Sequence, residues 1–314
     1  MRTMSFAAAF ELALPLYLLI LVGYLLGRHA GWSPSIGEAL SRFVFVVGIP
    51  SMLFGLTSEL SRLPPIDGRV LVAYFGACLA VFVLARLTGA RTFGQDGVAQ
   101  SVFAMGAIYG NTVMIGLPVA RAALGEEAVP SLALILVTNS IVLWTVATTS
   151  VEWARGGSPS PRAMLRTLRS VLANPVVASI LLGAAWSATG LALPTPLRST
   201  LNLLAQSAVP LALVSVGFGL AAYRIREGIA EASVMTALKL IALPLGAWLI
   251  ARAVGLGAVE TQVVVLLTSV ATGVNAYLMA REFRALQGPV GTGLILSHLV
   301  SAVTVPLVLR LTHA

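Results

Sequence analysis

The chain has 314 residues, of which 58% are hydrophobic and only 10% are charged, and its mean hydropathy is +0.93. Soluble domains carry about a quarter charged residues, so this composition excludes an aqueous enzyme fold and predicts an all-α protein in a lipid bilayer. The net charge of +8 comes from basic residues scattered singly between apolar runs, which argues against a nucleic-acid partner. The single cysteine, Cys78, lies in an apolar run and excludes a disulfide framework.

Apolar runs of about 20 residues, long enough to cross a bilayer, recur along the whole chain. Polar or Gly/Pro-rich stretches separate them. The first run is not followed by the usual small-residue cleavage site, so we expect a retained helix rather than a signal peptide. The sequence predicts ten transmembrane helices, at residues 10–30, 38–58, 69–89, 97–124, 128–151, 171–191, 199–222, 232–254, 259–284 and 288–311.

The middle of the chain divides two similar halves. Residues 152–170 are rich in Gly, Ser, Pro and Arg, as in a linker, between a first half at 1–151 and a second at 171–314. Three pairs share an offset of 160 residues: Pro15 and Pro175, Gly23 and Gly183, and Pro50 and Pro210. Five helices per half is an odd number, so the second half would enter the membrane from the opposite side, as an inverted repeat. The arginine distribution predicts a cytoplasmic linker and both termini outside.

Two of the expected helices are rich in residues that interrupt a helix. The segment 97–124 contains Gly110, Asn111 and Thr112, followed by Gly116 and Pro118. We expect Gly110, Gly116 and Pro118 to keep this helix discontinuous.

The segment 259–284 contains Thr272, Gly273 and Asn275 near its middle. Paired interrupted helices at corresponding positions indicate a substrate site near the bilayer midplane. Half-helix N-termini and the amides of Asn111 and Asn275 would suit an anion. The alternative is that the two asparagines are interhelical hydrogen-bonding residues.

The order of several short motifs resembles the auxin efflux carrier family, which includes plant auxin carriers and bacterial malonate permeases. The motifs are Leu14-Pro15 with Gly23-Tyr24, Gly48-Ile49-Pro50, Gly110-Asn111, Gly116-Leu117-Pro118, Ala173-Asn174-Pro175, Ala208-Val209-Pro210, Leu238-Lys239-Leu240 with Pro244, and Thr272-Gly273-Val274-Asn275. The resemblance implies a fold like that of the bile-acid sodium symporters.

In that fold the first, second, sixth and seventh helices would form a scaffold, and the third to fifth and eighth to tenth a transport domain. The resemblance also implies elevator-type movement, a carboxylate held by Asn111 and Asn275, and a bacterial cytoplasmic (inner) membrane location.

The chain departs from the family pattern at three places. Ala271 stands where a proline is common, so Thr272 and Gly273 alone would bend the second interrupted helix. The helix at 69–89 carries no acidic residue, so the proton-sensing arrangement of plant members does not transfer. Glu260 and Gln262 lie only at the start of the 259–284 helix, which weakens the case for sodium coupling.

Several further polar residues are expected at membrane depth, and most of them allow two interpretations. We expect Lys239 to extend to the cytoplasmic headgroups, with a salt bridge or an anion-attracting role inside the transport domain as the alternative. His298 is either hydrogen-bonded in place or a proton relay. Asn139 and Thr138 either line a cavity or pack. Ser51 and Gln206, near Pro50 and Pro210, are candidates to face the body of the substrate.

The sequence thus predicts a secondary transporter for a small organic anion, such as a mono- or dicarboxylate, with malonate the first candidate by resemblance. It needs no cofactor or metal; a proton is the candidate coupling ion and a homodimer the candidate assembly. A channel or membrane sensor is the alternative. An intramembrane enzyme fits less well, because Asp67 and Asp96 fall in expected loops and no Gly-x-Ser-Gly or P-loop element occurs.

Overall fold

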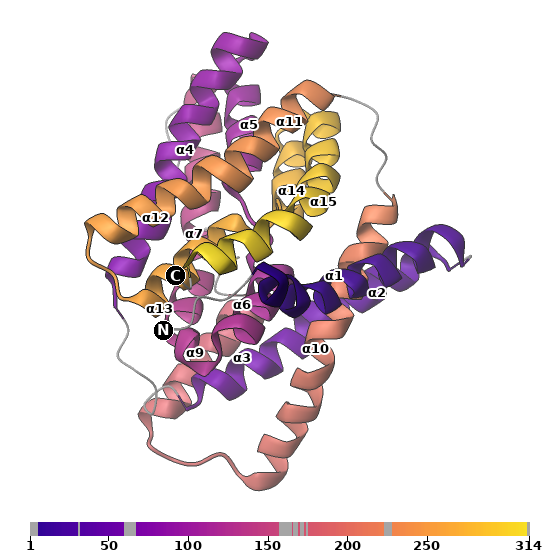
Figure 1. The fold of residues 1–314 in the computed structure, drawn as a ribbon, viewed down its shortest axis with the longest axis vertical. Helices are drawn as coiled ribbons and strands as arrows, with labels where there is room; N and C mark the ends of the chain where they lie inside the picture. Colours follow the sequence, from indigo (N-terminus) through magenta and orange to yellow (C-terminus); the bar gives the residue numbers. More distant parts are fainter. Residues whose placement is uncertain are drawn as a thin grey trace.

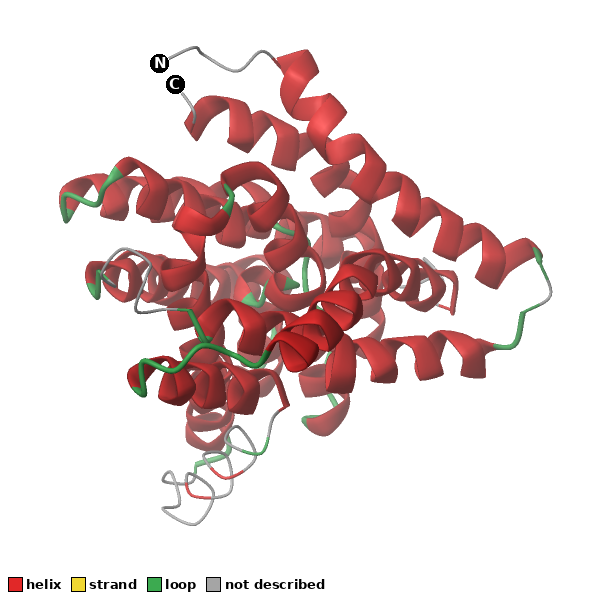
Figure 2. Cartoon of the chain, turned by 90° about the horizontal axis from the view of Figure 1, so that it is seen from below, coloured by secondary structure: helices red, strands yellow, loops and turns green. Residues whose placement is uncertain are grey.

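The computed structural model describes residues 6–30, 32–59, 67–156, 165, 169, 173, 175–222 and 228–312. Within these ranges the chain is helical, and its only β-type pairing is an isolated bridge between Gly110 and Thr272 (Figures 1 and 2). The all-α prediction is therefore confirmed for the described residues. Most of the expected 152–170 linker lies outside them.

The helices of the first half follow the hydropathy pattern closely. They are α1 (Phe6–His29), α2 (Pro34–Phe43), the π-helix η1 (Val44–Gly48), α3 (Ile49–Thr57), α4 (Arg69–Phe93), α5 (Gly97–Ile108), the π-helix η3 (Thr112–Gly116), α6 (Leu117–Leu124), the 3-10 helix η4 (Glu126–Ala128) and α7 (Val129–Ala154). Each expected segment of this half overlaps one of these helices or a consecutive set of them.

The second half has the same correspondence. Its helices are α9 (Pro175–Ala188), α10 (Thr195–Ala222), α11 (Ile229–Ala237), the π-helix η5 (Leu238–Ala242), α12 (Leu243–Ala253), α13 (Ala258–Ser269), α14 (Val274–Glu282) and α15 (Gln287–Thr312). Apolar runs of bilayer length are strong signals, which explains why the helices lie where the pattern places them.

Six continuous helical stretches are long and apolar enough to cross a membrane. They are Ser35–Thr57, Arg69–Phe93, Glu126–Ala154, Thr195–Ala221, Ile229–Ala253 and Gln287–Thr312. Shorter apolar helices include the two halves of the interrupted 97–124 segment and α13. Large apolar side chains such as Val83, Leu182 and Leu203 are exposed on the outside, as expected where lipid rather than water is the solvent. The chain is an integral, multi-pass membrane protein.

A π-turn precedes a proline at three places. The π-helices η1, η3 and η5 end at Gly48, Gly116 and Ala242, and Pro50, Pro118 and Pro244 follow two residues later. A proline inside a helix removes one backbone donor and crowds the preceding turn. The wider π-turn accommodates this locally, so the chain remains helical through each proline.

Two close helix pairs are built on glycines that share the 160-residue offset. A Cβ at Gly23 of α1 would overlap the backbone of Val214 in α10, and one at Gly183 of α9 would overlap the Thr57 side chain and the Phe54 carbonyl oxygen in α3. The contacted positions are themselves 160 residues apart (214 − 54 = 160). Glycine is required at both places because the two backbones approach within the space that a side chain would occupy.

The remaining helices pack into a second group. In Figure 1, α4, α5, α11, α12, α14 and α15 lie in the upper part of the molecule, while α1, α2, α3, α9 and α10 lie in the lower part. Contacts between α4 and α5, α4 and α12, and α11 and α15 hold the upper group together. The interrupted helices belong to this group and reach its border with the lower one.

Candidate functional site

Both helices predicted to be interrupted are interrupted in the structure, and their gaps cross each other. The helix α5 ends at Ile108 and α13 ends at Ser269, and short non-helical segments follow each. The Asn111 amide donates to the Ala271 carbonyl at 2.8 Å, and the Gly273 amide donates to the Tyr109 carbonyl at 2.9 Å. These reciprocal bonds form the antiparallel bridge, and we call residues 109–111 and 270–273 the crossover.

Small residues and side-chain donors make the crossover tolerable at membrane depth. A Cβ at Gly273 would lie 2.9 Å from the Gly110 carbonyl oxygen, so the two backbones can meet only without it. The Thr272 hydroxyl donates to the Gly106 carbonyl at 3.1 Å, and the Thr272 amide donates to the Ser297 hydroxyl at 3.0 Å. Backbone groups released from the helices therefore find partners inside the protein, as lipid cannot provide them.

The first gap lies at only one of the places where the sequence analysis expected it, at Gly110. Gly116 and Pro118 were expected to break the helix, but Gly116 ends the π-helix η3 and Pro118 lies in the first turn of α6, with helical backbone between them. The break lies at Tyr109–Asn111 instead. Gly116 serves packing, because a Cβ there would lie 2.8 Å from the Leu267 Cδ2 atom.

Two helix beginnings and two helix ends meet at the crossover. Asn111 is the N-cap of η3, and its Oδ1 atom accepts a hydrogen bond from the Met114 amide at 3.3 Å. Gly273 is the N-cap of α14 and has no side chain to cap it. Each N-terminus carries about half a positive charge and each C-terminus about half a negative charge. The crossover can therefore attract an anion on one side and a cation on the other.

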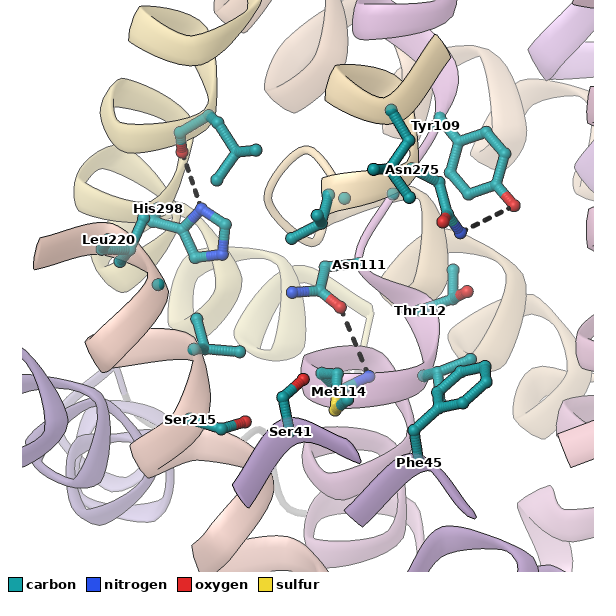
Figure 3. A pocket seen from close by; sticks show the side chains of 18 of the residues that line it. Ser41, Phe45, Tyr109, Asn111, Thr112, Met114, Ser215, Leu220, Asn275 and His298 are labelled. Carbon is teal, nitrogen blue, oxygen red and sulfur yellow. Dashed lines mark hydrogen bonds between the residues drawn. The ribbon is translucent and has the colours of Figure 1, made fainter. Parts of the chain in front are cut away.

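A pocket of about 720 Å³ opens beside the crossover (Figure 3). Five of the predicted substrate-binding residues line it: Gly110, Asn111, Thr112, Gly273 and Asn275. The sixth, Thr272, is buried beneath it and bonded to Gly106. Further walls come from α2, η1, α7, α10 and α15, through residues that include Ser41, Phe45, Asn139, Ser215, Leu220 and His298.

The two asparagines present their amides differently. The Asn111 side chain is 7% exposed, and its Nδ2 atom has no hydrogen-bond partner. The Asn275 side chain donates from Nδ2 to the Tyr109 hydroxyl at 3.1 Å (Figure 3). A primary amide nitrogen carries two N–H groups, so Asn275 retains a second donor. Both amides can therefore donate to a ligand in the pocket.

Lys239 does not extend to the headgroups, which corrects the expectation from sequence. Its side chain is fully buried, and Nζ donates to the Thr268 carbonyl at 2.6 Å. A Cβ placed on Gly110 would lie 3.2 Å from that Nζ atom. The amine therefore lies directly behind the crossover, at the C-terminal end of α13, where a helix favours a cation. Lys239 belongs to the π-helix η5, and its side chain is buried inside the protein.

Three other polar candidates take different places. Asn139 lines the pocket, and its Oδ1 accepts from the Tyr74 hydroxyl at 3.1 Å. Thr138 is bonded back to its own helix through the Leu134 carbonyl. Gln206 is exposed and lines neither pocket, so its expected contact with the substrate is wrong for this conformation.

Ser51 lines a second pocket of about 360 Å³ and not the crossover pocket. Two ion pairs flank this second pocket: Arg121 with Glu126 at 3.2 Å, and Arg198 with Glu59 at 2.9 Å. The first pocket contacts α10 between Ser215 and Leu220, whereas the second contacts it between Arg198 and Ala205. The two pockets thus lie toward opposite ends of the same helix.

Sequence reasoning missed several lining residues. Tyr109 borders the break and fixes Asn275, and its position beside Gly110 was the available signal. Ser41, Phe45 and Ser215 carry no such signal, because only packing decides which face of α2 and α10 meets the crossover. Within the described ranges no three His, Cys, Asp or Glu side chains are grouped to hold a metal ion.

A multi-pass helical chain with two interrupted helices crossing beside a pocket has the architecture of a membrane transport protein. A family model described as "Membrane transport protein" matches residues 8–309. The chain belongs to this family, that of the auxin efflux carriers, and the resemblance noted from its motifs is confirmed.

Similar proteins carry transporter names. The chain is 28% identical to a protein of Rhizobium meliloti named "Putative malonate transporter", over 67% of this chain and 66% of that protein. It is 27% identical to "Uncharacterized transporter YfdV" of Escherichia coli K12, over 67% and 68%. It is 29% identical to "Auxin efflux carrier component 8" of Arabidopsis thaliana, over 42% and 37%. The family is thus one of transporters rather than enzymes.

Proposed function

We propose that this protein is a secondary transporter that binds the carboxylate of a small organic anion at the crossover. The observation that carries the proposal is that Asn111 and Asn275, each beside a half-helix N-terminus, line one pocket. The substrate class is a mono- or dicarboxylate. Malonate is the first probe, because one relative is named for it.

The electrostatics of the pocket favour an anion. Desolvating a carboxylate costs several kcal/mol. A hydrogen bond to a charged group returns about 1.5–3 kcal/mol, and each helix N-terminus about 0.3–1 kcal/mol, so two of each are of the right size. Lys239 adds a buried amine immediately behind Gly110, which the sequence analysis had placed too far away to help.

Elevator-type movement is proposed from the two pockets and the internal repeat. The matching contacts of Gly23 with Val214 and of Gly183 with Phe54, and the antiparallel bridge at the crossover, support two halves related as an inverted repeat. In that arrangement α1, α2–α3, α9 and α10 form the scaffold, and the other helices carry the crossover. Displacing the helices that carry the crossover along α10 would move the crossover from the first pocket toward the second.

The conformation described here fits the inward-facing state. Glu38 and Arg42 of α2 line the open pocket, and the arginine distribution predicts that this end of α2 is cytoplasmic. The crossover asparagines line only this pocket.

Calorimetry of malonate binding to the purified protein tests the site. We expect Asn111→Ala and Asn275→Ala each to weaken binding by about 10- to 100-fold, the value of one hydrogen bond to a charged group. The matched control is Gln206→Ala, which removes an exposed primary amide that lines neither pocket and should leave affinity unchanged. The dimethyl ester of malonate should not compete. Equal binding by both crossover variants and the wild type would refute the assignment.

A carrier is distinguished from a channel by counterflow in proteoliposomes. Internal unlabelled malonate should accelerate uptake of labelled malonate by a carrier, because a carrier with substrate bound returns across the membrane faster than an empty one. Flux that rises linearly with concentration and shows no acceleration would indicate a channel instead.

A further inference from the structure

Two buried nitrogen atoms of the crossover pocket lack hydrogen-bond partners. One is Nδ2 of Asn111 and the other is Nε2 of His298, whose side chain is 4% exposed. Both residues line the pocket. An unpaired buried polar atom costs about 1–3 kcal/mol, so two of them around one space indicate that a ligand normally supplies the missing partners.

The hydrogen bonds of the two side chains fix what each free atom offers. The Asn111 Oδ1 atom accepts from the Met114 amide, which leaves Nδ2 as a donor directed into the pocket. The His298 Nδ1 atom lies 2.7 Å from the Leu294 carbonyl oxygen. A carbonyl only accepts, so Nδ1 must carry the hydrogen. The neutral imidazole then presents a lone pair at Nε2, and the imidazolium presents an N–H there.

Figure 3 places these atoms on opposite sides of the same space, with the amide nitrogen of Asn111 and the free ring nitrogen of His298 both directed toward it. A substrate carboxylate has two oxygen atoms. One can accept a hydrogen bond from the Asn111 amide, and the other can face the His298 imidazole. A carboxylate facing a neutral Nε2 lone pair would be repelled, whereas one shared proton between them makes a hydrogen bond. The pocket is therefore complementary to an anion and a proton together.

Other ionisable groups line the pocket or lie close to it. The titratable or charged residues that line it are Glu38 and Arg42 of α2 and Tyr109 of the crossover. On neighbouring α1, Tyr17 donates to the Ser301 carbonyl, and Lys239 of η5 donates to Thr268. No charged residue among the described parts of α11, α13 and α14 lines the pocket.

We propose that His298 is the proton site of this transporter, and that one proton is bound between its Nε2 atom and the substrate carboxylate each time an anion binds at Asn111. This rests on the proposed function and adds the coupling ion to it. In the step, a proton from solution is added to the free neutral imidazole and a carboxylate enters beside it. The pair is neutral, which avoids burying an uncompensated charge. Release of the anion on the other side returns the proton to solution.

Proton uptake measured by calorimetry tests this inference. Malonate is titrated into the full-length purified protein in two buffers of different ionisation enthalpy, and the difference in heat gives the protons bound. We expect uptake of about one proton per malonate at neutral to alkaline pH, with the apparent Kd weakening about tenfold per pH unit on the alkaline side.

His298→Gln keeps a hydrogen-bond donor but cannot titrate, so its proton uptake should fall to about zero and its Kd should become independent of pH. His29→Gln is the matched control, since His29 is exposed at the end of α1 and should behave as the wild type.

The experiment distinguishes failure of the His298 inference from failure of the proposed function. Malonate binding by the wild type without proton uptake, or equal uptake by His298→Gln, overturns the role of His298 while Asn111→Ala still tests the site. No malonate binding at all contradicts the proposed function and the inference together. Should His298→Gln fail to give a monodisperse protein, the pH series on the wild type decides alone, and a Kd that does not change with pH overturns the inference.

Discussion

A methyl group at Gly273 should damage the crossover at its tightest point. In Gly273→Ala the new Cβ would lie 2.9 Å from the Gly110 oxygen, 3.1 Å from the Gly110 carbon and 3.2 Å from the Asn111 nitrogen. All three are backbone atoms, so no side chain can move aside. Ordinary contact begins near 3.4 Å, so the two segments must separate by about 0.5 Å (3.4 − 2.9 = 0.5).

That separation would stretch the reciprocal bonds between Asn111 and Ala271 and between Gly273 and Tyr109, now 2.8 and 2.9 Å long. Overpacking of this kind costs about 1–3 kcal/mol of folding free energy. The Asn111 amide would move with its backbone, so we expect malonate affinity to fall at least tenfold, about 1.4 kcal/mol.

Thermal unfolding in detergent and calorimetric binding measure the two effects. The matched control is Gly246→Ala in α12, where the nearest atom to a new Cβ is the Ala77 Cβ at 3.8 Å. That change should leave binding intact and stabilise the helix by about 0.5–1 kcal/mol. If Gly273→Ala and Gly246→Ala have the same melting temperature and the same affinity, close approach at the crossover is not what positions Asn111.

Two further predictions follow from buried contacts. Lys239→Met removes an amine that lies behind Gly110. The attraction between this amine and a bound carboxylate is worth on the order of 1–2 kcal/mol, so malonate binding should weaken about tenfold while the melting temperature changes little. An unchanged affinity in calorimetry would contradict this. Gly23→Ala and Gly183→Ala should both destabilise the protein, because a Cβ at Gly23 would overlap the Val214 backbone and one at Gly183 would overlap the Thr57 side chain and the Phe54 carbonyl oxygen. A thermal melt that shows only one of them to be harmful would argue against equivalent halves.

The sequence predicted the helix positions well because a bilayer imposes one length and one composition on every crossing segment. It also predicted that the helices at 97–124 and 259–284 are interrupted, since Gly, Thr and Asn cluster in both. For the first helix it was right that the interruption includes Gly110 and wrong that it extends to Gly116 and Pro118. Gly116 and Pro118 are strong breakers in isolation, but the π-turn before Pro118 keeps the helix continuous, and a pattern of residue types does not reveal that turn.

The sequence was a poorer guide to which side of a helix faces the crossover. Ser51 and Gln206 point away from the crossover, and Lys239 points into it, because packing between helices fixes their rotation. Hydropathy cannot supply that rotation when nearly every face of a helix is apolar. His298 is hydrogen-bonded in place through Nδ1 to Leu294, and its Nε2 atom is the one that we propose binds the proton.

The burial of Lys239 has a practical consequence for chemical labelling. It is the sole lysine of the chain, and its side chain has no accessible surface, so every basic side chain at the surface is an arginine or a histidine. Reagents that acylate primary amines would find no lysine to modify on the folded protein. Acylation of Lys239 would then report, at a single defined residue, any opening of the packing behind the crossover.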